Sequence, residues 1–303
     1  MFIKKLGCVC IALVIQACAT PPKYTPITQQ NRDSIKTLDV YNLVMQDEVR
    51  PSVDVTNVTG AMGGGLLSAA IDASVNDDRS NESRSLTEEF YIVTEDIDYR
   101  ALQAQAVNSA LETLKPTNPK SSAEVMVMAD GEIKTRVAAL KAGEGFLFLT
   151  SHYLFVDNFK VLQTGTAAYF YVGSGGKVDY TKATYKNDFI YQSPTVGDGG
   201  AASIKLWSAD KGKLFREQLK NSLDTLREKM IYDMQPISNE TCINTTTFAF
   251  PTQVGVQTIT GNTVKTAADT SLIRSEDGAL YTVSTVKLSP AKKNTCGVTK
   301  NAK

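Results

Sequence analysis

The chain has 303 residues, of which 42% are hydrophobic, and it carries 32 basic and 32 acidic side chains. This length accommodates one large domain or two smaller ones, and the apolar content is ordinary for a folded protein. No run of five or more basic residues occurs. The sequence therefore lacks the electrostatic footprint of a nucleic-acid-binding protein, and we expect no nucleic-acid partner.

The N-terminus has the pattern of a secretory signal. Lys4 and Lys5 precede an apolar run of about a dozen residues, "LGCVCIALVIQA", and Pro21 and Pro22 follow it. Such a run is too short to span a bilayer, which takes roughly 20 residues, but it suits the apolar part of a signal peptide. The alternative is a buried N-terminal helix or strand, which the flanking lysines and prolines disfavour.

The end of this run, Ile15-Gln16-Ala17-Cys18, resembles the lipobox of bacterial lipoproteins. In that family an apolar residue lies three positions before the cysteine and a small residue directly before it; Gln16 stands where a small or apolar residue is commoner. The resemblance implies that residues 1–17 are removed as a signal peptide and that Cys18 is lipidated. Because Ala19 follows rather than an aspartate, it also implies the outer membrane, most simply facing the periplasm.

Residues 18–36 read as the lipidated cysteine and a tether, because they are polar and spaced by prolines. A buried methylene contributes about 0.8 kcal/mol to membrane affinity, so two or three acyl chains anchor a protein stably. The expected partner of the N-terminus is therefore the membrane.

The remaining cysteines sort by position. Cys8 and Cys10 leave with the signal, which leaves Cys242 and Cys296. An even pair in an exported protein predicts a disulfide, which would stabilise the fold by about 4 kcal/mol on the chain-entropy model. Two free thiols are the alternative. We expect no metal and no cofactor, since two cysteines and one distant histidine make a poor zinc site.

Small residues dominate the segment 58–76. An interaction face would comprise Gly60, Gly64, Gly65, Ser68 and Ala69, because a four-residue spacing of small residues lets a helix approach another backbone or a lipid surface closely. The alternative is a glycine-rich loop that leads into a short buried helix. Both interpretations stay open. No Gly-Lys-Ser/Thr follows the glycines, which disfavours a phosphate loop.

Hydrophobic periodicity predicts the elements of the folded body in chain order. A first strand covers 37–45, a strand over 90–93 leads into a helix that starts near Asp98 and stops at Pro116, and a short strand covers 123–130. The aromatic-rich segments 145–156, 161–172 and 178–192 predict an antiparallel meander.

The second half begins with the longest predicted helix, over 208–235. Its core stripe comprises Phe215, Leu219, Leu223, Leu226, Met230 and Met234. Lys220 and Asp224 are spaced to pair on its exposed side. Short strands follow from 245 to 288, with turns expected at "TGNT" (260–263) and "EDGA" (276–279).

These elements predict an α+β fold with a two-layer architecture: an antiparallel sheet with helices on one face. We expect an α+β domain over 37–236 and a β-rich C-terminal part over 237–303, closed by the disulfide. The order of elements looks like that of small periplasmic lipoproteins such as curli-secretion and penicillin-binding-protein-activator lipoproteins. That likeness concerns architecture only, because no motif is shared.

No catalytic constellation is apparent. His152 is the only histidine, lies in a predicted strand and has no G-x-S-x-G motif beside it. Acidic residues such as Glu88, Glu89, Asp96 and Asp98 collect where a helix begins, which the helix dipole explains. The tyrosines form a platform for sugar or peptide, or else cross-strand pairs that stabilise the sheet; they are Tyr153, Tyr169, Tyr171, Tyr180, Tyr185 and Tyr191.

The leading functional hypothesis is a lipid-anchored envelope lipoprotein that acts by binding, as a scaffold or assembly accessory, through an envelope protein partner or self-association. The alternative is a subunit of an oligomeric secretion or pore apparatus that packs through the glycine-rich segment. An enzyme acting on cell-wall glycan or lipid is the third, less favoured hypothesis.

Overall fold

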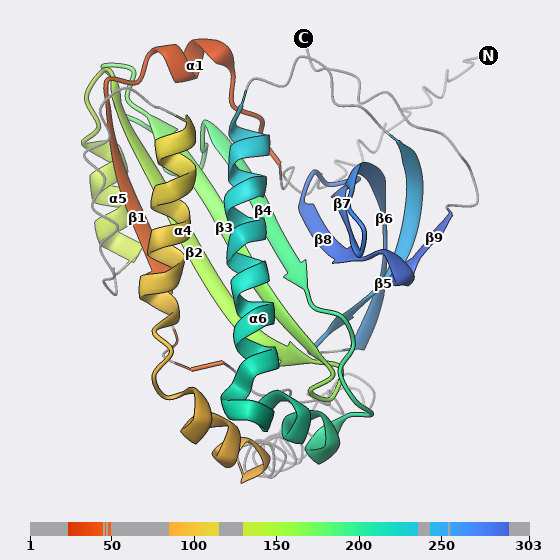
Figure 1. Cartoon of the computed structure of the whole chain (residues 1–303). Helices are drawn as coiled ribbons and strands as arrows, with labels where there is room; N and C mark the ends of the chain where they lie inside the picture. Colours follow the sequence, from red (N-terminus) through yellow and green to blue (C-terminus); the bar gives the residue numbers. More distant parts are fainter. Residues whose placement is uncertain are drawn as a thin grey trace, which may run out of the picture.

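A nine-stranded sheet organises the computed structural model, which describes residues 24–44, 46, 48–49, 85–114, 130–235, 243–253 and 255–290. The strand order is β1-β2-β3-β4-β8-β7-β6-β5-β9. Figure 1 shows the first four strands as an extended sheet and the remaining strands as a curled unit beside it. The chain therefore has a mixed α/β fold in which one sheet runs through both predicted parts.

The central strands are β1 (Thr37–Val44), β2 (Glu144–Val156), β3 (Val161–Val172) and β4 (Tyr185–Gln192). β2, β3 and β4 pair antiparallel, which confirms the predicted meander. The prediction that β4 would begin at residue 178 was wrong, because the chain between 173 and 184 forms irregular structure.

The C-terminal strands are β5 (Asn244–Thr252), β6 (Gly255–Thr266), β7 (Thr270–Ser275), β8 (Leu280–Ser284) and β9 (Leu288–Pro290). A 3-10 turn, η1 (Thr285–Lys287), separates the last two. The turn expected at 276–279 joins β7 to β8, as predicted. The prediction of a turn at 260–263 was wrong, because these residues lie inside β6, where residues 261–263 pair with β7. A Cβ added at Gly261 would be only 2.4 Å from the Arg274 carbonyl oxygen, so the glycine permits close approach of the two strands.

The sheet is mixed rather than antiparallel as expected. β1 pairs parallel to β2 along its whole length, and β4 pairs parallel to β8 over three residues. Each of these pairings joins strands that are far apart in the chain and connected through helices, the kind of connection that parallel strands require. Periodicity along one strand carries no information on the direction of its neighbour, which explains the error.

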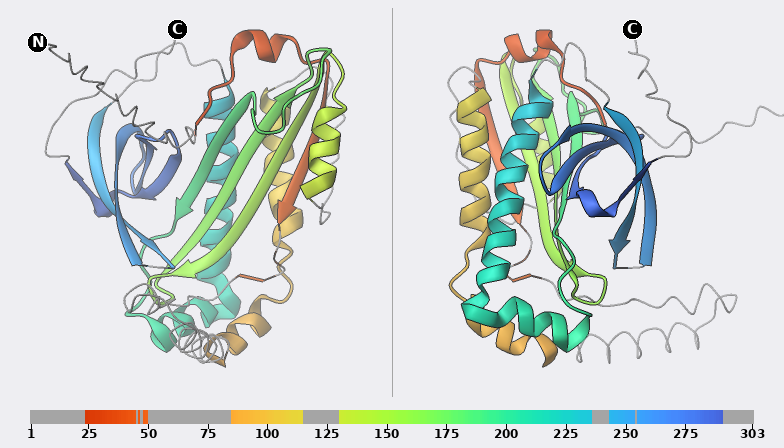
Figure 2. Two further views of the ribbon diagram at one scale, coloured as in Figure 1. Left: turned by 180° about the vertical axis from the view of Figure 1, so that it is seen from behind. Right: turned by 45° about the vertical axis from the view of Figure 1, so that its right-hand side comes forward.

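Helices lie on both faces of the sheet, whereas the sequence predicted helices on one face only. α4 (Tyr99–Leu114) and α6 (Gly200–Met234) cover one face, and α5 (Asp130–Ala138) packs on the other. The left-hand view in Figure 2 shows α5 in front of the strands and the two long helices behind them. Alternation along β2 supports both layers: Leu147 and Leu149 pack under the long helices, while Phe146 and Phe148 pack under α5.

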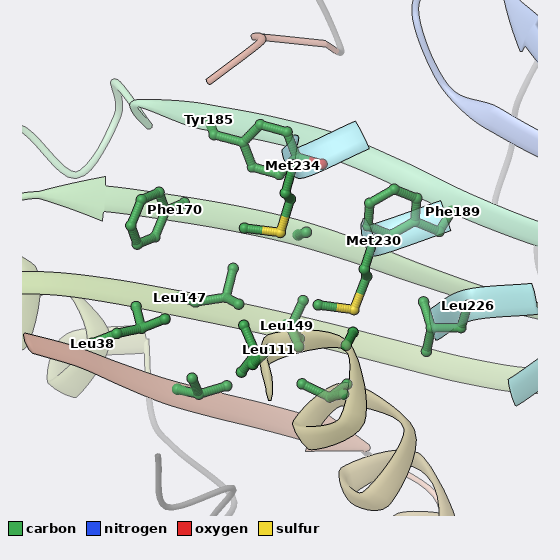
Figure 3. Packing of buried hydrophobic residues seen from close by; sticks show 14 of the residues in the cluster. Leu38, Leu111, Leu147, Leu149, Phe170, Tyr185, Phe189, Leu226, Met230 and Met234 are labelled. Atoms are coloured by element: carbon green, nitrogen blue, oxygen red, sulfur yellow. The ribbon is translucent and has the colours of Figure 1, made fainter. Parts of the chain in front are cut away.

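The principal core lies between the sheet and the two long helices. Figure 3 shows Met230 and Met234 of α6 and Leu111 of α4 over the aliphatic and aromatic side chains of the strands. The whole predicted stripe of the longest helix, from Phe215 to Met234, is buried. On α4, Leu102 is 39% exposed whereas Gln103 is buried and donates hydrogen bonds to Ser151 and Thr166. The sequence predicts an apolar stripe on this helix that includes Tyr99, Leu102 and Val107, and at Leu102 that prediction was wrong.

α6 breaks near its N-terminus, at a point where the sequence predicted its start. Asp210, Lys211 and Gly212 have left-handed backbone angles, so residues before and after them form two helical pieces at an angle to each other (Figure 1). Trp207 and Phe215 flank the break and pack together, with ring centroids 6.4 Å apart. The aromatic contacts offset the cost of left-handed non-glycine residues, which is about 1–3 kcal/mol each.

Residues 85–94 form a helix, so the prediction of a strand over 90–93 was wrong. Phe90 is fully buried among Phe155 and Phe215, with centroids 5.4 and 4.8 Å away. A short apolar run fits either a strand or a buried helical turn, and here packing against Phe215 of α6 favours the helix. Asp98 caps α4 by accepting from the Ala101 amide at 3.0 Å, as expected.

The described part of the expected tether contacts the folded body. α1 (Gln29–Asp33) is capped by Thr28, and the Thr25 backbone forms a bridge with Lys186 of β4. Ile35 is 6% exposed. Residues 24–36 are therefore attached along the sheet before β1 begins.

Candidate binding site

An open groove lies on the face of the sheet that carries α5. It has a volume of about 600 Å³ and lies between α5 and the irregular segment before β4; its lining comprises Lys134, Thr135, Ala138, Lys177, Val178, Asp179, Tyr180 and Thr181. Its size is within the range of small-molecule and peptide side-chain pockets. The groove is thus a candidate binding site.

α5 presents the groove because its other side is anchored in the sheet. Ile133 and Val137, one helical turn apart, are buried against Phe146 and Tyr171. Lys134 and Ala138, also one turn apart, are left to face the groove. The helical period of 3.6 residues thus separates an anchoring side from a lining side.

The opposite wall is held by tyrosine contacts. The rings of Tyr171 and Tyr180 stack with centroids 5.9 Å apart and planes 14° from parallel, and the Tyr171 hydroxyl donates to the Tyr180 carbonyl at 3.0 Å. The Lys134 ammonium lies 5.7 Å from the Tyr180 ring centroid, which is within cation–π range. The aromatic wall is therefore fixed from both the sheet and α5.

The charges of the groove are uneven. Hydrogen bonds from the Thr181 hydroxyl and amide, at 2.7 and 2.9 Å, hold the pKa of the Asp179 carboxyl below its usual range. The same carboxylate lies 3.4 Å from the Lys182 ammonium. Within the described part of the chain, Lys134 and Lys177 take part in no ion pair. The groove consequently offers two ammonium groups beside an apolar and aromatic surface.

The six tyrosines divide between the two faces of the sheet, so they do not form one platform. Tyr153, Tyr185 and Tyr191 are buried under the helices, whereas Tyr169 and Tyr171 belong to the cluster beneath α5. Several make ring contacts that stabilise the layers: Tyr169 stacks on its neighbour Phe148 at 6.2 Å, and Tyr153 on Tyr99 at 4.0 Å. The hypothesis of sheet stabilisation accounts for most of them, and Tyr180 alone lines the groove.

His152 lies exposed on β2, opposite Gly165 of β3. A Cβ at Gly165 would be only 2.4 Å from the imidazole, so the missing side chain makes room for the ring. His152 is not a lining residue of the groove. Among the described residues, no group of three or more histidine, cysteine or acidic side chains gathers at metal-binding distance.

Two buried charges of α6 lie outside the groove. Asp233 accepts hydrogen bonds from Arg274 at 2.6 Å, Tyr185 at 2.5 Å and Asn187 at 2.6 Å. Lys229, one turn earlier, is 2% exposed and donates to the Ile190 carbonyl. Burial lowers the pKa of the Lys229 ammonium well below its usual value.

Several predicted site residues lie outside the described residues: Cys18, Cys242, Cys296, Gly60, Gly64, Gly65, Ser68 and Ala69. Their roles in lipidation, the disulfide and the interaction face stay predictions. Over the ranges that are described, none of the helices combines the length and the apolarity needed to cross a bilayer.

A comparison with known protein families, curated proteins and solved structures finds no match for this chain. The candidate site therefore depends on its own geometry. No sequence pattern marks Lys134 or Lys177 as a binding residue, because neither belongs to a motif. The spacing of Ile133, Val137 and Leu140 is a helical signal that could have placed Lys134 on the exposed side of a helix.

Proposed function

We propose that the chain is a lipid-anchored envelope protein of the outer membrane that acts by binding, as a scaffold or assembly accessory. The lipobox-like sequence around Cys18 supports the anchor. The groove between α5 and residues 177–181 supports the binding role, because it is preformed and combines apolar, aromatic and cationic groups.

The occupant that this chemistry favours is an acidic segment of a partner protein. Lys134 and Lys177 supply positive charge, and a partner carboxylate beside them would form charge-assisted hydrogen bonds. Val178, Ala138 and the Tyr180 ring supply apolar surface for a neighbouring side chain. The single observation that carries the proposal is this pair of lysines, which have no acidic partner among the described residues.

Site-specific crosslinking in intact cells tests the binding role. A photo-crosslinking amino acid at Thr135, in the groove, is expected to capture a discrete protein, identified by mass. The double substitution Lys134→Glu and Lys177→Glu is expected to reduce that product at least tenfold, because it places two carboxylates against an acidic segment. Lys205→Glu, an exposed change on α6, is the matched control and should leave it unchanged. Equal crosslinking in both variants would contradict the proposal.

The anchor has a separate test. Labelling of cells with a radioactive or alkyne fatty acid should mark the wild-type protein and not Cys18→Ala. Membrane fractionation should then find the wild type with outer-membrane vesicles. An unlabelled, freely soluble wild type would refute the anchor and leave the groove experiment valid.

A further inference from the structure

A second, smaller cavity lies between α6 and the C-terminal strands. It has a volume of about 70 Å³, and Thr225, Thr270 and Thr282 are among its lining residues. One water molecule needs roughly 10–15 Å³ by this kind of measure, so the cavity has room for a group as large as sulfate or phosphate. The lining combines charged and hydroxyl-bearing residues with the apolar side chains of Ala267 and Leu272.

Lys229 forms part of this lining and is almost completely buried. An ammonium group has three N–H donors, and the Ile190 carbonyl is its one acceptor in the described structure. The described residues place no carboxylate within ion-pair distance of it. Buried charges in proteins are normally paired, so a protonated Lys229 needs an anion, and the described residues do not supply one.

Lys265 of β6 brings a second ammonium group to the same cavity. Its Nζ lies 3.3 Å from a carboxylate oxygen of Glu228, and both side chains are more than half exposed. Glu228 and Lys265 are the ionisable groups that share the lining with Lys229. The lining therefore has one acidic and two basic groups, with the unpaired basic group at the buried end.

We propose that this cavity binds a free oxyanion of the size of sulfate or phosphate, held by the ammonium groups of Lys229 and Lys265 and by the threonine hydroxyls. The anion supplies the acceptors that the buried ammonium lacks. The anion competes with Glu228 for the Lys265 ammonium. The Glu228 carboxylate, at the exposed end of the cavity, therefore weakly opposes anion binding. The site uses none of the residues of the groove and does not depend on the proposed function.

Binding of the anion is coupled to protonation of Lys229. Burial lowers the pKa of the Lys229 ammonium, whereas a bound anion favours the charged form and raises that pKa again. The occupied site therefore takes up a proton. Affinity rises as the pH falls, by up to tenfold for each pH unit between the pKa of Lys229 in the empty site and its pKa in the occupied site.

Isothermal titration of the purified full chain with sodium sulfate tests the proposal, because sulfate does not itself titrate near neutral pH. The buffer contains chloride at matched ionic strength, and the titration is repeated in two buffers with different ionisation enthalpies. We expect saturable binding of one sulfate with uptake of up to one proton. Absence of saturable binding between pH 6 and 8 overturns the proposal.

Variants assign the site. Lys229→Met should weaken sulfate binding at least tenfold and abolish proton uptake, while Lys220→Met, at an exposed position of the same helix, should change neither. Lys265→Met should weaken binding and keep the proton uptake, which decides the matter even where Lys229→Met does not fold. Unchanged affinity in Lys265→Met or in folded Lys229→Met overturns the assignment.

Discussion

Two lysine–aspartate pairs with the same four-residue spacing lie on α6, and their environments differ completely. Lys220 and Asp224 are exposed and contact each other at 2.6 Å, as the spacing predicts. Lys229 and Asp233 are buried and contact other groups instead: Lys229 contacts β4, and Asp233 contacts β4 and β7. Spacing on a helix predicts which side chains are neighbours, whereas burial decides which partners they take.

The buried Asp233 shows how the two halves of the sheet are joined to α6. Asp233 is bonded to Arg274, whose guanidinium also donates to the Gly278 carbonyl at 2.9 Å and lies over the Tyr24 ring at 4.8 Å. The ion pair of Asp233 and Arg274 thus connects α6, β4, β7 and, through the Tyr24 ring, the segment before α1. The exposed pair connects α6 only to itself.

Removal of the cation beside Asp233 should have the largest effect on stability and tests the contrast between buried and exposed charges most directly. Arg274→Met should lower the free energy of unfolding by about 3–5 kcal/mol, because it leaves a buried carboxylate without its counter-charge. Urea denaturation at neutral pH measures the loss. The double variant with Asp233→Asn should recover part of it, and a loss below about 1 kcal/mol would show that the pair is not buried as described.

The pH dependence of Lys229→Met gives the next largest effect. Because the folded-state pKa of Lys229 is lowered from 10.5, the unfolded chain binds more protons below that pH, and wild-type stability rises with pH towards 10.5. The contribution of Lys229 to the free energy of unfolding changes by up to about 1.4 kcal/mol per pH unit. The variant should lack it. Urea midpoints at pH 8, 9 and 10 in chloride buffer measure the difference, and parallel profiles would contradict the lowered pKa.

Tyr185→Phe tests a single hydrogen bond to the buried carboxylate. It removes the hydroxyl that donates to Asp233 at 2.5 Å while it keeps the packing of the ring. A loss of about 1.5 kcal/mol is expected, since hydrogen bonds to charged groups contribute more than neutral ones. Chemical denaturation gives the value. Tyr232→Phe, on a half-buried ring of the same cluster, offers a comparison at a tyrosine that does not bond to Asp233.

Lys220→Ala should have the smallest effect. The exposed pair with Asp224 contributes about 0.3–0.5 kcal/mol and is screened by salt. The difference from wild type should vanish at about 1 M sodium chloride, where the Debye length is about 3 Å. A loss as large as that of Tyr185→Phe would mean that exposure does not explain the contrast between the two pairs.

Sequence periodicity predicted the elements whose contacts are local. The stripe from Phe215 to Met234, the cap at Asp98 and the meander of β2–β4 follow from patterns within one or two elements. The same stripe held a further signal, because Lys229 and Asp233 fall three and seven residues after Leu226 and so face the core. Polar residues at such positions predict buried charges, although their partners stay unknown.

The errors concern contacts between distant segments. The parallel pairing of β1 with β2, the helix around Phe90 and the break at 209–212 all depend on packing against residues far away in the chain. The groove was missed for the same reason. Its lysines come from α5 and from an irregular segment, and only the sheet beneath them brings the two together.

The short parallel contact between β4 and β8 has a consequence for the order in which the strands pair during folding. Among the described residues of β4, Phe189, Ile190 and Tyr191 pair with the C-terminal strands, and their partners, Leu280–Thr282, lie far from them in the chain. Non-local strand pairing is slow, so the central meander would form while this flank is still bare. A bare strand flank recruits other chains. The C-terminal strands thus cover this edge of the meander, and a chain truncated before Leu280 should expose the edge and be prone to aggregation.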